Sequence, residues 1–508
     1  MQRAAQWFLA SLMLTTLGLS LQGCAPAGEF GMTETKSEGE MAQEKSEIMF
    51  PCLNKPEVTS TVPGDTKLLS QVGIDCFAWQ EFIGLNWPAD PAKAGQPDPK
   101  ASAADFGKPS DTGSVVWETY MDAHQIFRAD AISPAPWGTP PPVPDSCQKL
   151  VGEETGQMRL MQPSKVRTEF EAEESIAQAF PFANPAWLAD RDGNLVWYEL
   201  LVSEDEFNYI AQNAYYNAEE QYAAVSAGKH VVLPAGVLEG ALGAIELKAA
   251  WLTVQDPSEA RWRRFKLTEA YIVNSTTEQC EKKTLALVGL HILHKTVQQP
   301  QWTWATFEHV DNAPDTGQAE SGQQYTFYNP TCQEMEVPSG CQAKLTADGK
   351  PVRKTSCDAN VSPAYYIDPA KGCNPYPVRV TRDYAIPNSN DNPVVDLNKA
   401  VHELIRQANP DSVWQYYELV NVLWSDSPVN DNAPGTKPPV VPLSLSGQTP
   451  PQSSRPVANT TMETYAQAFN CLHCHRNGTI ADSSQDPSPK YASDYSFLFS
   501  MAQPPASD

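Results

Sequence analysis

The stretch T-L-A-L-V-G-L-H-I-L-H, residues 284–294, is apolar on both faces of an extended chain. Successive side chains of a strand point to opposite faces, so a strand of this kind is buried on both sides. We therefore expect residues 284–294 to form the central strand of a sheet. Such a strand needs other strands beside it and packed layers above and below it.

Five further segments have the composition of strands, being rich in Val, Ile, Leu, Trp and Tyr. They are residues 114–120, 195–202, 244–254, 263–273 and 302–309. The last of them alternates clearly and ends at the turn-like sequence D-N-A-P. We therefore expect the sheet to contain strands that precede residues 284–294 in the chain and a strand that follows them.

Helical spacing is less frequent. Residues 204–225 have apolar or aromatic side chains at helical intervals, and residues 397–407 and 412–423 are two more expected helices, separated by an Asn-Pro pair. The mixture predicts an α+β fold, with a mainly β body and helical additions over residues 51–426.

The composition narrows the classes of partner. The 508 residues include 61 acidic and 36 basic side chains, for a formal net charge of -25. An acidic surface repels nucleic acid phosphates and anionic lipid, so we expect no nucleic-acid partner. The charge favours a basic partner or serves solubility alone. The sequence holds no G-x-G-x-x-G, no P-loop and no H-E-x-x-H motif.

The first 23 residues have the pattern of a lipoprotein signal peptide. Arg3 is followed by a short apolar region and then by L-Q-G-C, which ends at Cys24 and resembles the bacterial lipobox. Lipidation of Cys24 would anchor the chain to a membrane. The alternative is a plain secretory signal, which leaves Cys24 available for a disulfide. Ala25 after the cysteine is typical of sorting to the outer membrane, on its periplasmic or surface face.

Residues 24–50 are polar and rich in Glu, with few large apolar side chains. Such a segment cannot bury enough apolar surface to offset the entropy of ordering. We expect it to be a flexible acidic tether between the anchor and the body.

The cysteine count is consistent with an oxidising compartment. Of eleven cysteines, one is expected to carry lipid and two belong to the C-terminal motif described next, which leaves eight. An even remainder predicts four disulfides, although the pairing cannot be read from the sequence. Because four of the eight fall within residues 332–373, two local bridges are expected there.

Residues 427–456 form a proline-rich connector, and residues 457–508 form a C-terminal segment. A helix is expected to begin at Asn459 or Thr460, because T-T-M-E matches a capping box. It would run into C-L-H-C-H, at Cys471, Cys474 and His475. Two thiols three positions apart on one helical turn can each form a thioether with a haem vinyl group.

The C-x-x-C-H pattern predicts one covalent haem c, with His475 as the proximal iron ligand. The other ring nitrogen of His475 should meet a hydrogen-bond acceptor. A thioredoxin-like redox pair is disfavoured because no βαβ pattern surrounds the motif. A zinc site is disfavoured because no second C-x-x-C or H-x-x-H lies nearby in the sequence.

The sequence offers two candidates for the distal ligand. Met501 lies in an expected amphipathic helix over residues 493–502, and a His/Met pair is an ordinary arrangement. His309 ends a strand before a loop and is the alternative candidate. His291 and His294 lie in the most apolar strand, where a histidine is usually a satisfied core residue.

Several stretches are similar to large bacterial lipoproteins described as cytochrome c family proteins. They are F-A-W-Q-E-F-I-G-L-N-W-P from residue 77, A-I-E-L-K-A-A-W from 244, L-V-G-L-H-I-L-H-K-T from 287, W-A-T-F-E-H-V-D-N-A-P from 304, A-N-T-T-M-E-T-Y from 458, and C-L-H-C-H. The resemblance is patchy over about four-fifths of the chain. It implies haem binding and electron transfer but supplies no substrate.

These observations predict a membrane-anchored c-type cytochrome that transfers electrons outside the cytoplasm to or from a redox partner protein. Two alternatives remain at this point, since electron transfer alone does not account for the large body. One is a haem-containing oxidoreductase or peroxidase-like enzyme. The other is a binding module that docks a redox partner or a glycan.

Overall fold

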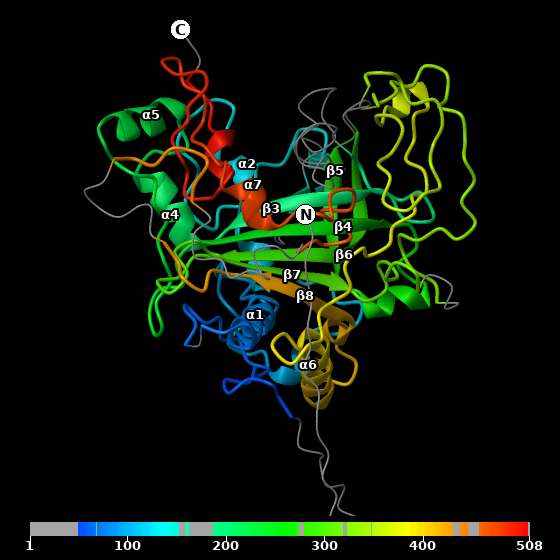
Figure 1. The fold of residues 1–508 in the computed structure, drawn as a ribbon, viewed down its shortest axis with the longest axis horizontal. Coiled ribbons are helices and arrows are strands. Elements are labelled where there is room, and N and C mark those ends of the chain that lie inside the picture. Colours follow the sequence, from blue (N-terminus) through cyan, green and yellow to red (C-terminus); the bar gives the residue numbers. More distant parts are fainter. Residues whose placement is uncertain are drawn as a thin grey trace, which may run out of the picture. The chain divides into compact units, whose positions relative to one another are not determined.

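The strand β6, Cys280–His294, occupies the centre of the sheet, as predicted (Figure 1). β4 pairs along one of its edges, while β5 and β7 pair with its first and second halves on the other edge. All of these pairings are antiparallel. Its apolar residues are buried on both faces, because side chains such as Leu287 join one large core and neighbours such as Val288 join a cluster on the other side of the sheet.

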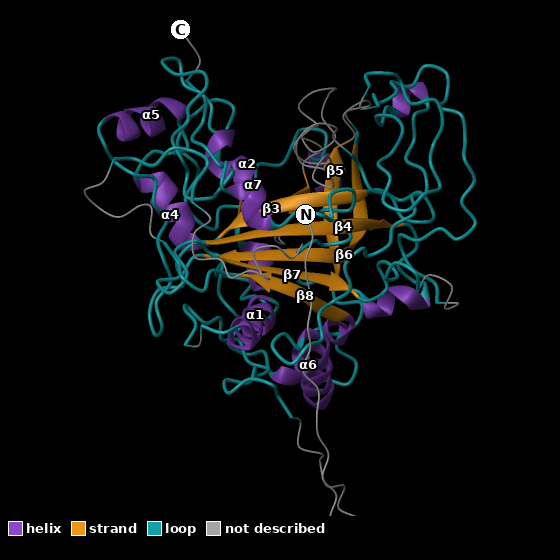
Figure 2. Ribbon diagram, viewed as in Figure 1, coloured by secondary structure: helices purple, strands orange, loops and turns teal. Residues whose placement is uncertain are grey.

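Within the residues that the structure describes, eight strands form one sheet (Figure 2). They are β1 (Met121–Asp122), β2 (Arg159–Met161), β3 (Val196–Val202), β4 (Ile245–Val254), β5 (Leu267–Val273), β6, β7 (Thr303–His309) and β8 (Tyr417–Leu423). β1 pairs with β3, β3 with β4 and β7 with β8, all antiparallel, while the short β2 runs parallel to β5. The α+β class with a mainly β body is confirmed.

The structure is a computed structural model of the chain. It describes residues 49–67, 69–151, 159–161, 186–273, 279–318, 323–346, 348–429, 437–444 and 457–505. The expected signal peptide, most of the acidic tether including Cys24, and most of the proline-rich connector lie outside the described residues. The C-terminal segment belongs to the same compact unit as the body.

One face of the sheet is covered by helices. α1 (Gln71–Leu85) and α6 (Val394–Ala408) lie beside β7 and β8 (Figure 1). Their apolar side chains join one large core with those of β4, β6 and β7, including Trp79, Phe82 and Phe307. We call this the helix face. Burial of large aromatic side chains here supplies much of the apolar stabilisation of the body.

The opposite face receives the C-terminal segment, and we call it the C-terminal face. Two smaller apolar clusters lie on it, one around Trp304 and Leu293 and one around Tyr198 and Val288. The register places Lys248, His291 and Thr306 side by side on β4, β6 and β7. These polar residues alternate with Leu247, Ile292 and Ala305, which belong to the core of the helix face.

The remaining helices are short. They are α2 (Ala123–Ile126), α3 (Gln148–Val151), α4 (Glu204–Gln212), α5 (Ala218–Ser226) and α7 (Cys471–His475). The prediction of one continuous helix over residues 204–225 is therefore wrong, because the helix is interrupted between α4 and α5. Ala214 adopts a left-handed φ of 56° between α4 and α5, which ends the helical path.

Other local predictions were also wrong, and tertiary pairing explains them. Residues 412–423 were expected to be helical, but a single turn of 3-10 helix is followed by β8, because that stretch pairs with β7. Residues 114–120 form a 3-10 turn, Val116–Thr119, rather than a strand. The helix α1 was not predicted, because it is buried on almost every side and its buried polar residues, such as Asp75 and Glu81, leave no amphipathic period.

The four predicted disulfides are confirmed. Two of them, Cys332–Cys357 and Cys341–Cys373, are the local bridges expected within residues 332–373. The other two are Cys52–Cys76 and Cys147–Cys280. Among the described cysteines, only Cys471 and Cys474 are outside disulfides.

No helix in the described part of the chain has both the length and the apolar character needed to cross a membrane.

Candidate functional site

The C-x-x-C-H motif forms the short helix α7. Its start differs from the prediction, because residues 459–469 fold as a series of turns. The N-cap is Asn470, whose side chain accepts a hydrogen bond from the backbone N–H of His473. Leu472 is fully buried in the apolar cluster around Trp304, which fixes the face of α7 that meets the body. Cys471 and Cys474 consequently lie half-buried along the helix.

His475 is held in a defined orientation. Its Nδ1 lies 2.8 Å from the backbone carbonyl oxygen of Tyr495, so this nitrogen carries the hydrogen and donates it. The rings of Trp304 and Phe497 pack against the imidazole, with centroids at 4.5 and 4.8 Å. Nε2 forms no hydrogen bond to any described residue and is left as the potential metal-binding atom. The acceptor expected for the other ring nitrogen is therefore present.

The carbonyl of Tyr495 is presented by a strained turn, residues 493–496, which we call the Tyr495 loop. Asp494 and Tyr495 both adopt left-handed backbone conformations, with φ of 58° and 71°. Two consecutive non-glycine residues of this kind persist only where the surroundings enforce them. The expected helix over residues 493–502 is accordingly reduced to a 3-10 turn, Leu498–Met501.

The body holds the Tyr495 loop through Asp494. Its carboxylate forms an ion pair with Lys295 and accepts a hydrogen bond from the backbone N–H of Leu233 at 2.8 Å. The indole of Trp302 donates to the backbone carbonyl of Asp494 at 3.0 Å. Both charged side chains are almost completely buried. The hydrogen bond to His475 is thus fixed by residues just outside β6 and β7.

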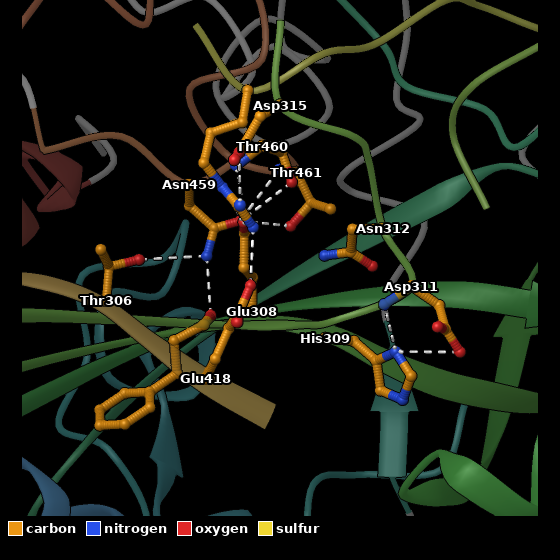
Figure 3. A network of polar contacts seen from close by, with 12 residues as sticks. Thr306, Glu308, His309, Asp311, Asn312, Asp315, Glu418, Asn459, Thr460 and Thr461 are labelled. Atoms are coloured by element: carbon orange, nitrogen blue, oxygen red, sulfur yellow. Dashed lines mark hydrogen bonds and ion pairs between the residues drawn. The ribbon is translucent and has the colours of Figure 1, made fainter. Parts of the chain in front are cut away.

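The stretch Asn459–Glu463 docks the C-terminal segment on the sheet, and we call it the docking turn. Asn459, Thr460 and Thr461 are fully buried. The amide of Asn459 donates to the hydroxyl of Thr306 and to the carbonyl of Phe307, at 3.1 and 2.8 Å (Figure 3). These bonds satisfy polar groups that would otherwise be costly to bury.

Glu308 links the docking turn to the rest of the body. One carboxylate oxygen accepts hydrogen bonds from the backbone and the hydroxyl of Thr460, at 2.8 and 2.6 Å. The other oxygen pairs with Arg382, which also contacts Asp315 and Glu418 (Figure 3). Arg382 thus brings three carboxyl groups to one point, and Glu308 connects them to the docking turn.

Gly289 allows the docking turn to approach β6. A Cβ atom at this position would press on the hydroxyl of Thr461 and lie 2.9 Å from Oδ1 of Asn459, closer than real Cβ atoms come to their neighbours. We expect Gly289→Ala to displace the docking turn and to lower the free energy of unfolding by about 1–3 kcal/mol, as in other overpacked cores. Urea unfolding measures this loss.

The control for Gly289→Ala is a cycle with Thr461→Ala, which removes the nearest atom. If the clash is real, the double variant should be more stable than the sum of the two single changes. Simple additivity would contradict the assigned contact.

Three polar side chains that the sequence does not predict to lie at the site are found beside the motif. They are Lys248 on β4, His291 on β6 and Glu463 in the docking turn. Nε2 of His291 lies 3.0 Å from a carboxylate oxygen of Glu463. All three act electrostatically on the imidazole of His475. The apolar context of His291 had favoured a core role, and only the register with Lys248 brings it to this site.

The charges of this group are defined by its surroundings. Burial raises the pKa of Glu463, but His291, Lys248 and the N–H of Asn459 outweigh this effect, so the pKa is lowered and Glu463 is an anion. Burial lowers the pKa of His475 to about 4, against the opposing effect of the Tyr495 carbonyl. The imidazole is therefore neutral at pH 7, as a metal ligand must be.

The two thiols differ from those of a redox C-x-x-C pair. Burial, followed by the negative charge of Glu463, raises the pKa of Cys471 well above its usual value and that of Cys474 to about 11. Reactive disulfide oxidoreductases instead have a lowered thiol pKa. Within the described residues, no cluster of three or more His, Cys, Asp or Glu side chains is arranged to hold a metal ion. The raised pKa values of the two thiols do not favour thiol–disulfide exchange.

The structure does not bring His309 to the motif, so its candidacy as a distal ligand is corrected. His309 is completely buried, with Nε2 on the carbonyl of Arg264 at 3.0 Å and Nδ1 accepting from Asp311 at 3.1 Å. Its ring stacks on Phe265. Both nitrogens are committed, which makes His309 a satisfied core residue.

Met501 lies at the end of the 3-10 turn that follows the Tyr495 loop, and it packs at the edge of the same apolar cluster as Cys471. Two residues later, Gln503 forms a bridge with Asn217 at the start of α5. Met501 therefore packs against the same part of the body as the motif, and its role as the distal ligand stays a prediction.

Several stretches quoted for the family resemblance converge on this site. Glu308 and Trp304 come from one of them, His291 from another and Glu463 from a third, which lies more than a hundred residues further along the chain. The chain matches no protein-family model, no curated protein sequence and no solved structure.

Proposed function

We propose that this protein is a membrane-anchored c-type cytochrome that carries one covalent haem and transfers electrons outside the cytoplasm. The observation that carries the proposal is the state of the C-x-x-C-H motif. Its two thiols are unpaired while the other described cysteines form disulfides, and its histidine has one nitrogen fixed and the other uncommitted. A haem c needs this donor set.

The residues present fit a haem. Cys471 and Cys474 would form the thioethers and Nε2 of His475 would bind the iron, which supplies one-electron chemistry when the group is bound. The carbonyl of Tyr495 keeps the imidazole in the tautomer that leaves Nε2 available. The motif is also surrounded by apolar side chains, namely Trp304, Phe497 and Leu472. They exclude water, which strengthens the electrostatic interactions of nearby charged groups.

The visible spectrum of the purified protein, with and without reductant and carbon monoxide, tests this function. A c-type spectrum that stays with the polypeptide after acid–acetone extraction supports it. A six-coordinate low-spin haem indicates a carrier, whereas a high-spin haem that binds carbon monoxide readily indicates the peroxidase-like or oxidoreductase alternative. A colourless protein obtained under conditions of haem maturation contradicts the proposal.

A redox partner is expected to approach the outer side of α7. His473 is exposed there, and Phe469, which is 46 % exposed, stacks on it with ring centroids 5.5 Å apart. An apolar contact at the edge of the motif would bring a partner close to the iron. The net charge of -25 favours a partner with a basic surface.

Lipid anchoring is a separate part of the proposal and rests on the lipobox alone. We expect Cys24→Ser to release the protein from the membrane fraction or to leave its signal peptide unprocessed. Fractionation followed by mass determination of the N-terminus measures this. Ala25→Asp provides a control that keeps the cysteine, and it should remain membrane-bound. Normal membrane partition of the Cys24→Ser variant would contradict the anchor.

A further inference from the structure

Two anchors of the C-terminal segment meet at Arg382. Its guanidinium donates to Oε1 of Glu308 at 2.9 Å, and Oε2 of Glu308 accepts the hydrogen bonds from Thr460 of the docking turn (Figure 3). The residues directly before and after Arg382 bind the side chain of Gln467 through their backbone groups, each at 2.9 Å. A displacement of Arg382 would therefore disturb both anchors.

The guanidinium of Arg382 has more acidic partners than its single charge can balance. Besides Glu308, it donates to Asp315 at 2.8 Å and to Glu418 at 2.7 Å. Arginine stays protonated in proteins, so three ionised carboxyl groups around it would leave an excess of negative charge. Glu308 and Glu418 also lie directly opposite each other on β7 and β8, where like charges destabilise a sheet.

Glu418 is the member of this group that is placed to gain and lose a proton. It lies on the edge strand β8, and its side chain is 19 % exposed, whereas that of Glu308 is completely buried and accepts hydrogen bonds on both oxygens. Burial raises the pKa of Glu418 to about 7, with Arg382 opposing the shift and Glu308 and Asp315 reinforcing it.

We propose that Arg382 and Glu418 form a proton-operated latch for the C-terminal segment. A neutral Glu418 leaves Arg382 to Glu308 and Asp315, and the docking turn stays closed. Release of the Glu418 proton to water adds a negative charge beside Glu308, and the repulsion loosens the docking turn. The latch does not require the haem, so it goes beyond the proposed function.

Other charged groups near this end of β8 are engaged elsewhere. Asp383 accepts hydrogen bonds from two other side chains, at 3.2 and 2.8 Å. Arg264 packs on the ring of Tyr416 and pairs with Asp311 at 2.8 Å. The charge of Glu418 is thus governed by the groups gathered around Arg382.

The direction of the pH effect follows from the two states of the latch. When the docking turn opens, water reaches Glu418 and its pKa returns towards the ordinary value of 4.5. The closed state binds the proton more tightly, so closure weakens as the pH rises from about 4.5 to about 7. Each pH unit in this window changes the equilibrium by up to about tenfold, and the effect levels off at higher pH.

Hydrogen–deuterium exchange of the full-length protein at a series of pH values tests the latch. The N–H groups of Thr460 and Asp383 report on the two anchors, and protection factors correct for the intrinsic pH dependence of exchange. We expect both protection factors to fall by at least about tenfold between about pH 5 and about pH 8. That of Val352, which lies in the disulfide-bridged insertion, should change little.

Matched variants identify the group that titrates. Glu418→Gln has nearly the shape of the neutral carboxyl group and cannot ionise. Its protection factors at about pH 8 should equal those of the wild type at about pH 5. Glu336→Gln removes an exposed glutamate that pairs with Lys354, and it should keep the wild-type pH profile. If Glu418→Gln retains the wild-type pH dependence, another group is responsible and the proposal is wrong.

The wild type decides the matter even if Glu418→Gln does not fold. Protection of Thr460 and Asp383 that stays constant from about pH 5 to about pH 8, or that increases with pH, would overturn the latch. Absence of covalent haem would remove the proposed function but leave this pH profile as expected, so the two proposals fail separately.

Discussion

Replacing both motif cysteines, in Cys471→Ala/Cys474→Ala, is expected to abolish covalent haem attachment completely. A thioether needs a sulfur at each position, and no other described cysteine is outside a disulfide. Acid–acetone extraction of the variant should remove all haem absorbance from the polypeptide, whereas the wild type should keep it. Mass spectrometry of the intact chain should show the loss of one haem mass.

A disulfide variant controls for indirect effects of cysteine loss. Cys332→Ala/Cys357→Ala opens a local bridge in the loop-rich insertion, so it should lower stability but leave the haem attached. Single replacement of Cys471 or Cys474 should leave one thioether and a shifted absorption band. Retention of unextractable haem by the double motif variant would show that the site lies elsewhere.

The second large effect is expected at Asp494. Asp494→Asn removes the charge that balances Lys295, whose side chain is only 4 % exposed. Loss of one partner from a buried ion pair costs about 3–5 kcal/mol, because the remaining charge is left without compensation. Urea unfolding should therefore show a large decrease in the free energy of unfolding.

Asp494→Asn should also change the haem. The Tyr495 loop would lose an anchor, and the hydrogen bond from Nδ1 of His475 to the Tyr495 carbonyl would weaken. A weaker acceptor makes the imidazole a poorer electron donor to oxidised iron, so the midpoint potential should rise. Redox titration of the holoprotein measures this shift.

Two variants separate these effects from a general loss of charge. Asp482→Asn removes an exposed carboxylate of the same segment and should change stability by less than about 0.5 kcal/mol. Asp494→Asn/Lys295→Met removes both charges and should recover part of the lost stability. If Asp494→Asn and Asp494→Asn/Lys295→Met were equally stable, the buried ion pair would be contradicted.

Much of the fold followed from local patterns. The doubly apolar stretch at residues 284–294 indicated the central strand, and the structure confirms it as β6. The even number of remaining cysteines indicated four disulfides, because unpaired thiols are unusual in an oxidising compartment. Both features depend on residue type and spacing, which the sequence displays directly.

Local patterns failed where long-range pairing decided the outcome. Residues 417–423 look helical, but the edge of β7 makes them a strand. The docking turn carries a capping sequence, yet Glu308 and Thr306 take its hydrogen bonds and hold it as a turn. In each case, contacts with residues more than a hundred positions away outweighed a local propensity of less than about 1 kcal/mol per residue.

The sequence by itself determined the central strand, the disulfide count and the C-x-x-C-H motif with its expected chemistry, since each is encoded in neighbouring residues. Only the tertiary structure decided what surrounds the motif. Lys248, His291 and Glu463 meet there because strand register and the close approach at Gly289 bring them together. Tyr495 matters through its backbone carbonyl, which residue identity does not reveal. A cofactor site built from distant polar side chains and from backbone atoms has no periodic signal in the sequence, and only the folded sheet assembles it.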